Sequence, residues 1–202
     1  QLLQQGWEAI QRARAANART QRERDWIEAL APFYEEHATI DQQTRTQRYA
    51  DAMGRLHQRY PADSEAAVFY ALALLEAVDL SDKTYASQLK AAAILEGLQK
   101  SQPNHPGIVH YIIHAYDVPA LAPRALDAAR RYAAIAPSAP HALHMPSHTF
   151  TRLGYWQESI QSNIASAASA AAESATAEQL HAMDYMAYAY LQRAAADHVI
   201  HA

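Results

Sequence analysis

The chain lacks cysteine and contains few glycines, and each scarcity excludes a class of site. Without cysteine it can form no disulfide, no thiolate metal site and no cysteine nucleophile. Only 5 of its 202 residues are glycine, and no phosphate-binding glycine loop is present. The Gly-x-Ser-x-Gly and His-Glu-x-x-His motifs are also missing. These absences remove most of the short motifs by which an enzyme class is recognised.

The chain also lacks a basic surface and a long apolar run. Its formal net charge is -4, whereas nucleic-acid-binding proteins concentrate Lys and Arg on one face. The arginines between residues 12 and 24 are interleaved with Glu23 and Asp25, a pattern typical of a solvated helix surface. No apolar run reaches the roughly 18 residues that a membrane-spanning helix requires. We therefore predict no nucleic-acid partner and no membrane span in this chain.

The chain is rich in residues that favour helices. Hydrophobic residues make up 50% of it, many of them alanine, which is the best helix former and lets helices pack closely. No stretch alternates with the period of two that a half-buried strand shows. The sequence therefore predicts an all-α fold. The predicted helices cover residues 2–19, 20–36, 44–60, 64–78, 85–100, 106–118, 124–136, 141–153, 155–173 and 177–193.

Several helix ends are marked by local signals. Thr20 followed by Glu23 is the pattern of a capping box, in which each residue satisfies a backbone N–H of the other. Pro61 stops the preceding helix, because proline cannot donate a backbone hydrogen bond. Asp63 or Ser64 then caps the helix that follows.

An internal repeat of 34 residues runs through the middle of the chain. A shift by that length places prolines on prolines and histidines on histidines: Pro103 on Pro137, Pro106 on Pro140, His110 on His144, and His114 on His148. Periods of this length are typical of helix pairs that stack side by side and bury a continuous core. The repeat therefore predicts a solenoid of antiparallel helix pairs.

The chain resembles the tetratricopeptide repeat family. The string LGYWQESIQSNIASA is similar to that family's junction between the two helices of a unit. Longer strings resemble a group of bacterial tetratricopeptide repeat proteins whose function is uncharacterised. They are TQRERDWIEALAPFY, DKTYASQLKAAAILEGL, HPGIVHYIIHAYD, APHALHMPSHTFTRLG and HAMDYMAYAYLQ. The resemblance covers nearly the whole chain.

The resemblance implies a right-handed superhelical solenoid, with residues 1–202 forming one repeat domain. Members of the group are generally longer and often carry export signals. Because the chain begins at Gln1 in helical pattern and without Met, we expect it to be a fragment of a longer protein. The resemblance also implies a bacterial protein that is exported to the periplasm rather than cytoplasmic. It predicts the fold and names no activity.

In this family the first helix of each unit lines the concave surface, and its other face packs on the second helix. Applied to this chain, that register predicts one packing side and one groove side for each histidine-bearing helix. The predicted packing residues are Val109, Ile112, Ile113 and Tyr116 in the first such helix, Leu143, Ser147 and Phe150 in the next, and Met183, Ala187 and Tyr190 in the last. The histidines fall on the opposite sides.

Two histidine pairs and one carboxylate form the strongest candidate site. Residues four apart share a helix face, and neighbouring helix axes lie about 8–10 Å apart. His110 and His114 are therefore expected to face His144 and His148 across one gap, with Asp117 at its edge. Imidazole and carboxylate ligands predict a divalent metal such as Zn, Cu, Fe or Mn. Without thiolates, the set resembles an open site with a water position more than a closed structural zinc site. Metal-activated water and dioxygen chemistry both fit, and the pattern does not decide whether the protein is an enzyme.

Five further residues are predicted to line the groove and bind a small ligand or a peptide there: His141, Arg152, His181, Asp184 and Tyr188. Arg152 lies one turn beyond His148 and could hold an anionic group or form a salt bridge with Asp117. His105 stands in a turn, where a helix-capping role is expected rather than metal ligation.

Two other readings of the histidines stay open. They could line a polar groove that binds a peptide or a protein partner, or they could hydrogen-bond across units and hold no metal. The first alternative makes the protein an interaction module, a common use of solenoids. Pro146 adds a structural question, because a proline between His144 and His148 should kink or restart the helix.

Overall fold

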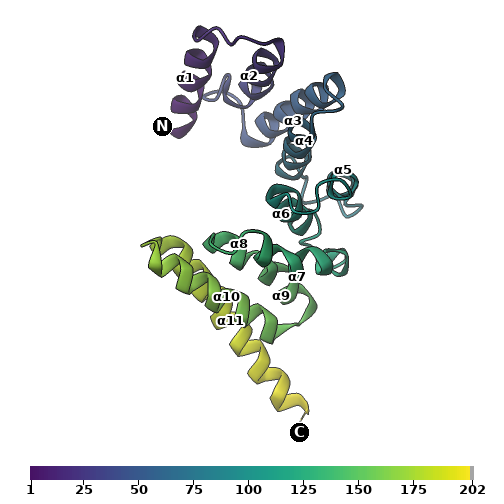
Figure 1. The fold of residues 1–202 in the computed structure, drawn as a ribbon, viewed down its shortest axis with the longest axis vertical. Helices are drawn as coiled ribbons and strands as arrows, with labels where there is room; N and C mark the ends of the chain where they lie inside the picture. The colour runs from purple at the N-terminus through teal and green to yellow at the C-terminus, as the bar shows by residue number, and fades with distance from the viewer. Residues whose placement is uncertain (201–202) are drawn as a thin grey trace. The chain divides into compact units, whose positions relative to one another are not determined.

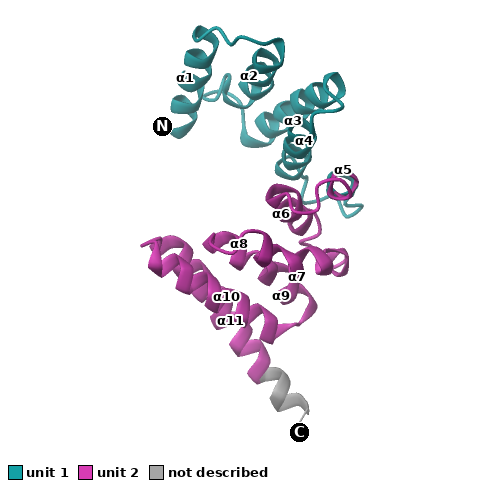
Figure 2. Cartoon of the chain, in the orientation of Figure 1, with its two compact units in different colours: residues 1–95 teal, residues 96–202 magenta. Residues whose placement is uncertain are grey.

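The computed structural model describes the backbone of residues 1–200 and the side chains of residues 1–194. All regular secondary structure in that range is helical, which confirms the predicted all-α class (Figure 1). The chain divides into two compact units, Gln1–Leu95 and Glu96–Ala202 (Figure 2). The boundary falls inside one helix, α5 (Ala86–Gln99). One repeat domain over residues 1–202 stays a prediction.

Unit 1 contains four complete helices and most of α5. They are α1 (Leu2–Ala15), α2 (Gln21–Tyr34), α3 (Gln42–Arg59) and α4 (Ser64–Glu76). Helix α2 packs against α1 and α3, and α3 packs against α4. The core consists mainly of alanines with Met53 and Leu56, edged by aromatic side chains that include Trp26 and Tyr70. Alanine at these contacts lets the helices approach closely, as the composition predicted.

The predicted helix signals in unit 1 are confirmed. Thr20 and Glu23 form both hydrogen bonds of a capping box at the start of α2. Asp63, rather than Ser64, caps α4 by accepting hydrogen bonds from the backbone N–H groups of its first turn. Helix α3 ends at Arg59, two residues before Pro61. These ends are set by local hydrogen bonding, which is why the sequence predicts them closely.

Unit 2 contains several short helices followed by two long ones. They are α6 (Pro106–Ala115), the 3-10 turn η1 (Ala122–Ala125), α7 (Leu126–Ile135), α8 (Pro140–His144), α9 (Pro146–Leu153), α10 (Trp156–Ala172) and α11 (Thr176–Ile200). Helix α10 packs against α8, α9 and α11, and α6 packs against α7. The histidine-bearing segments of α8 and α11 therefore both rest on α10.

Pro146 restarts the helix, as predicted, and the interruption is small. It separates α8 from α9 because it has no N–H to donate to the preceding turn. Met145 between them keeps a helical backbone, with φ -51° and ψ -37°. The chain thus continues in the helical sense, and His144 and His148 still lie one turn apart.

The predicted packing sides are right for α6 and wrong for α11. Val109, Ile112, Ile113 and Tyr116 are all buried. In α11, however, Met183 and Tyr190 are exposed, and the buried residues between 176 and 194 are Ala182 and Ala189. The two alanines lie seven residues apart, on one stripe of the helix. Because α10 is itself rich in alanine and serine, α11 packs on it through small side chains, and the long ones point elsewhere.

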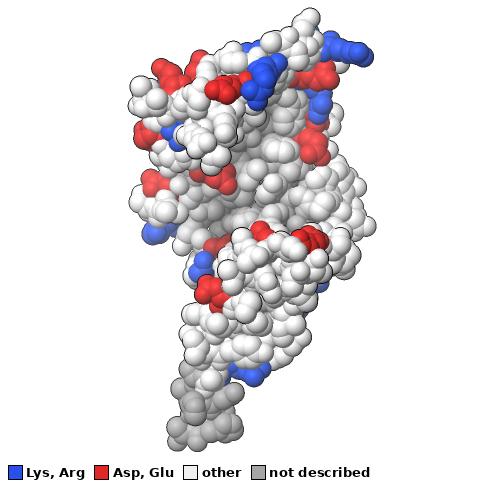
Figure 3. Space-filling model, turned by 90° about the vertical axis from the view of Figure 1, so that its left-hand side faces the viewer, with Lys and Arg blue, Asp and Glu red and all other residues white. Residues whose placement is uncertain are grey.

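The surface agrees with the composition. On the face drawn in Figure 3, Lys and Arg side chains are interspersed with Asp and Glu, and no basic patch is visible there. In the described part of the chain, no helix is both long and apolar enough to cross a bilayer.

Candidate metal centre

Six histidines of unit 2 gather into two clusters. The first triad is His110, His114 and His141, and the second triad is His144, His148 and His181. In each triad, one ring nitrogen from every histidine lies within 4.8 Å of the others. The four histidines predicted to share one site are thus divided between two triads. His141 and His181, predicted to bind a ligand, complete them.

Each triad draws on neighbouring helices. His110 and His114 are one turn apart on α6, and α8 supplies His141, so the first triad joins two elements. His144 ends α8, His148 lies on α9 and His181 lies on α11, so the second triad joins three (Figure 1). The two triads adjoin, since the rings of His114 and His148 have centroids 6.0 Å apart.

Two histidines of the second triad, His144 and His148, are held by hydrogen bonds to Nδ1. His144 Nδ1 lies 2.7 Å from Asn163 Oδ1, and His148 Nδ1 lies 2.9 Å from Asp117 Oδ2. The Asn163 amide donates its Nδ2–H to the Ser159 carbonyl, which leaves its oxygen facing the His144 ring. Asparagine oxygen and carboxylate accept but do not donate, so both Nδ1 atoms must carry the proton. The tautomer of each ring is fixed by its neighbour.

That anchoring leaves two unprotonated nitrogens facing one another. Nε2 of His144 and Nε2 of His148 are 3.0 Å apart. With both protons on Nδ1, neutral rings place two lone pairs toward each other, and only a cation or an added proton between them satisfies both. Burial lowers the pKa of His144 to about 4; the hydrogen bond to Asn163 opposes this shift, and the nearby His148 and His181 add to it. His144 therefore resists taking up that proton itself at neutral pH, and either a proton carried by His148 Nε2 or a metal ion between the rings would satisfy both nitrogens.

His144 does not open onto a groove, contrary to the prediction. It is 1% exposed, because its Nδ1 side is held against Asn163 of α10. A polar stripe of α10, made by Ser159, Asn163 and Ser166, is fully buried beneath the triad.

The first triad is arranged more loosely. His110 Nε2 and His114 Nε2 are also 3.0 Å apart, but the described residues offer neither ring a comparable acceptor at Nδ1. The His110 ring stacks on Tyr132, with centroids 5.6 Å apart. His141 Nδ1 lies 3.6 Å from a carboxylate oxygen of Glu178.

The histidines of α6 are also poor proton acceptors. Burial, with repulsion from His114, lowers the pKa of His110 to about 3. Although part of the His114 ring reaches solvent, surrounding protein atoms and the nearby His148 lower its pKa to about 4. Both rings are neutral at pH 7 and keep a lone pair for a cation.

Asp117 lies behind the second triad rather than among its ligand atoms. One carboxylate oxygen accepts from His148 Nδ1, and the other accepts from Arg152 Nε at 2.9 Å. Burial raises the pKa of Asp117, but the hydrogen bonds from His148 and Arg152 outweigh it and hold the pKa below its usual range. The carboxylate is thus ionised and orients His148, a role that strengthens metal ligation by histidine. The salt bridge between Arg152 and Asp117 that the sequence suggested is present.

A cavity of about 320 Å³ opens beside the second triad. It brings together three of the predicted ligand-binding residues, Arg152, Asp184 and Tyr188. Tyr185 forms the wall between cavity and triad, with its ring centroid 4.7 Å from that of His144. Burial, and then the charge of Asp117, raises the pKa of Tyr185, so its phenol is neutral.

Sequence reasoning missed Asn163 and considered Tyr185 only as a residue that could extend the site beside His181, Asp184 and Tyr188. Asn163 could have been found as the centre of a polar stripe, Ser159–Asn163–Ser166, in a helix otherwise rich in alanine. Tyr185 stands four residues after His181, on the same face of α11. His105 was assigned correctly, since its Nδ1 accepts the backbone N–H of Ile108 and caps α6.

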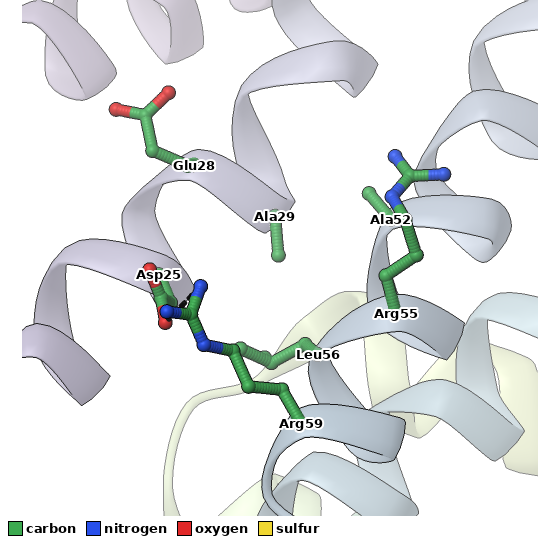
Figure 4. Close-up of a pocket in the computed structure, with 7 residues that line it drawn as sticks. All are labelled: Asp25, Glu28, Ala29, Ala52, Arg55, Leu56 and Arg59. Carbon is green, nitrogen blue, oxygen red and sulfur yellow. Dashed lines mark ion pairs between the residues drawn. The ribbon is translucent and has the colours of Figure 1, made fainter.

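Unit 1 has a cavity of different character (Figure 4). About 280 Å³ in volume, it is lined by Arg55, Arg59 and two carboxylates, Asp25 and Glu28, over an apolar floor. Asp25 pairs with Arg59 at 3.0 Å, and Glu28 pairs with an arginine of α1. The carboxylates are neutralised by arginine and no imidazole lines this cavity, so it is a poor metal site.

No protein-family model, curated protein or solved structure matches the chain. The geometry of the two triads is therefore the basis for a function.

Proposed function

We propose that unit 2 binds a divalent transition metal, and that the second triad, His144, His148 and His181, is the primary site. The observation that supports this is the 3.0 Å separation of two unprotonated Nε2 atoms. Two imidazole nitrogens that each lie about 2.0–2.1 Å from one Zn²⁺ are about 2.9–3.4 Å apart, for angles between about 90° and 109°. The free rings already stand at the spacing that a shared ion requires.

The donor set favours particular ions. Among the predicted metals, imidazole suits Zn, Cu and Fe, whereas Mn prefers oxygen ligands. Three protein ligands leave a coordination position for water or a small molecule, the pattern of reactive rather than structural zinc sites. The first triad is a second, weaker site, because the hydrogen bonds that would orient its rings are absent among the described residues.

The scaffold that carries the site is part of the proposal. We infer a tetratricopeptide-like, right-handed solenoid of antiparallel helix pairs in a bacterial, exported protein. The 34-residue sequence repeat and the packing of successive helices in each unit support the solenoid. Export to the periplasm rests on the sequence resemblance alone.

The test is calorimetric titration of Zn²⁺ into untagged, chelator-stripped protein. The wild-type chain should bind at least one equivalent, and His148→Ala should weaken that site at least tenfold. His105→Asn is the matched control, because it removes a neighbouring histidine while asparagine can still cap α6. Equal affinity in wild type and His148→Ala would reject the second triad as the site.

The competing function is a metal-free interaction module whose histidines line a polar groove. The network that links Arg152, Asp117 and His148 favours it, since one added proton between the Nε2 atoms would complete that network without an ion. Wild-type protein that binds none of Zn²⁺, Cu²⁺ and Fe²⁺ in the titration would select this alternative.

A further inference from the structure

The cavity beside the second triad carries two separated charges of opposite sign. Arg152 and Asp184 both line it, yet no ion pair joins them. Arg152 contacts Asp117 through Nε, which leaves the two terminal nitrogens of its guanidinium for another partner. Asp184 is an exposed carboxylate, and its charge acts on Tyr185 in the wall of the same cavity. The cavity thus presents one positive and one negative group to its contents.

Aromatic rings form the wall near these charges. Tyr185 and Tyr188 both line the cavity, and Trp156 packs edge-on against Tyr188 with ring centroids 6.1 Å apart. Tyrosine rings attract a cation over their faces and also pack against apolar groups. A ligand with an ammonium group and an apolar side chain can therefore contact these rings through both groups.

The charge balance selects the ligand class. Asp117 and Arg152 neutralise one another in part, and Asp184 adds one negative charge. A phosphate or a dicarboxylate would meet repulsion from Asp184, while a simple amine would leave the terminal nitrogens of Arg152 without a partner. A molecule with one carboxylate and one ammonium group satisfies both. The volume of about 320 Å³ lies at the small end of the range for ligand pockets, roughly 300–1,000 Å³.

We propose that this cavity binds a small zwitterion of the free amino acid class, with the carboxylate on Arg152 and the ammonium group on Asp184 between Tyr185 and Tyr188. The proposal goes beyond metal binding and does not require the ion. A ligand seated there would lie against His148, which is shared by the cavity and the second triad.

The experiment is a calorimetric titration with three probes that differ in one charge each. They are L-phenylalanine, N-acetyl-L-phenylalanine, which lacks the ammonium group, and L-phenylalaninamide, which lacks the carboxylate. L-Phenylalanine should bind best. Arg152→Gln and Asp184→Asn should each weaken it about tenfold, because each removes a charge-assisted contact.

The cross pattern is the decisive result. Asp184→Asn should leave the affinity for N-acetyl-L-phenylalanine unchanged, and Arg152→Gln should leave the affinity for L-phenylalaninamide unchanged. Matched controls are Arg130→Gln and Asp127→Asn, which change the same charges on the surface of α7 in unit 2. No binding of L-phenylalanine at millimolar concentration, or equal affinity in all four variants, would overturn the proposal.

Each titration is run on chelator-stripped and on Zn²⁺-loaded protein. Zwitterion binding by protein that takes up no metal would sustain this inference and refute the metal site. Metal uptake without any zwitterion binding would do the reverse, so the two failures are distinguishable.

Discussion

The two units satisfy their polar side chains differently. Unit 1 pairs unlike charges: Arg14 with Glu28, Arg22 with Asp63, Arg48 with Glu36, and Arg59 with Asp25. Unit 2 places like groups together, with six imidazoles in two triads. A guanidinium and a carboxylate complete one another, whereas two imidazole lone pairs do not. These charges of unit 1 are thus paired within the unit, whereas the metal that we propose would complete the imidazole pairs of unit 2.

The largest effect is expected from removing Asn163, which holds His144 of the second triad. Asn163→Ala should lower the free energy of unfolding of the metal-free protein by about 2–4 kcal/mol, because it leaves the buried His144 N–H unpaired and opens a small cavity. Urea denaturation in chelator measures this. Ser162→Ala, at the neighbouring and less buried position of α10, is the control and should change little. An Asn163→Ala loss as small as that of the control would contradict the anchoring role.

Acid should destabilise the metal-free protein through the histidines of unit 2. The pKa of His144 is about 4 in the folded protein against an ordinary 6.5, so the unfolded chain binds the proton first as the pH falls. Stability present above pH 6.5 is then lost progressively down to pH 4, by at most about 3 kcal/mol for this residue. The pKa values of Asp63 and Glu28 are lowered by their arginine partners, so the ion pairs of unit 1 persist through that window.

Melting temperatures at pH 7 and pH 5, in chelator, check the acid prediction. The melting temperature of the wild-type protein should be lower at pH 5 than at pH 7. The decrease should be smaller for His144→Gln. A drop of the same size in both proteins would show that His144 is not the group responsible.

Asp117 differs from the carboxylates of the unit 1 ion pairs, because it accepts a hydrogen bond from a histidine, His148, as well as from an arginine, Arg152. Asp117→Asn should weaken metal binding about 10–100-fold while the fold is retained, since a neutral amide orients His148 less strongly. Competition with a chromophoric chelator measures the affinity, and circular dichroism checks the fold. Asp127→Asn supplies the control. Unchanged affinity would mean that Asp117 only holds Arg152.

The smallest effect is expected in unit 1. Arg14→Gln breaks a pair with Glu28 that is largely solvent-exposed, so the free energy of unfolding should change by less than about 1 kcal/mol. Metal affinity should not change at all. A loss of metal binding in Arg14→Gln would show that the two units are not chemically independent.

Local features of the fold could be predicted from the sequence, and partnerships between helices could not. Thr20, Asp63 and His105 act on backbone groups within four residues of themselves, so their roles follow from sequence order. The division into two triads depends on how each helix is rotated and offset against its neighbours. His141 joins α6 and His181 joins α8 for that reason, and spacing alone cannot show it.

The packing face of α11 was also predicted wrongly, because it depends on contact with another helix, α10. A hydrophobic pattern ranks Met183 and Tyr190 above Ala182 and Ala189 as packing residues. Contact with an alanine-rich partner helix reverses that order, because close approach leaves room only for methyl groups. Asn163 went unseen because its partner lies 19 residues away on another helix.

The most direct test of the metal centre is X-ray absorption spectroscopy at the zinc edge on untagged, Zn²⁺-loaded protein. The wild-type spectrum should show three imidazole nitrogens at about 2.0–2.1 Å from the zinc, and the His181→Ala spectrum should show two. Spectra without imidazole scattering, or spectra that are identical in wild type and His181→Ala, would contradict it.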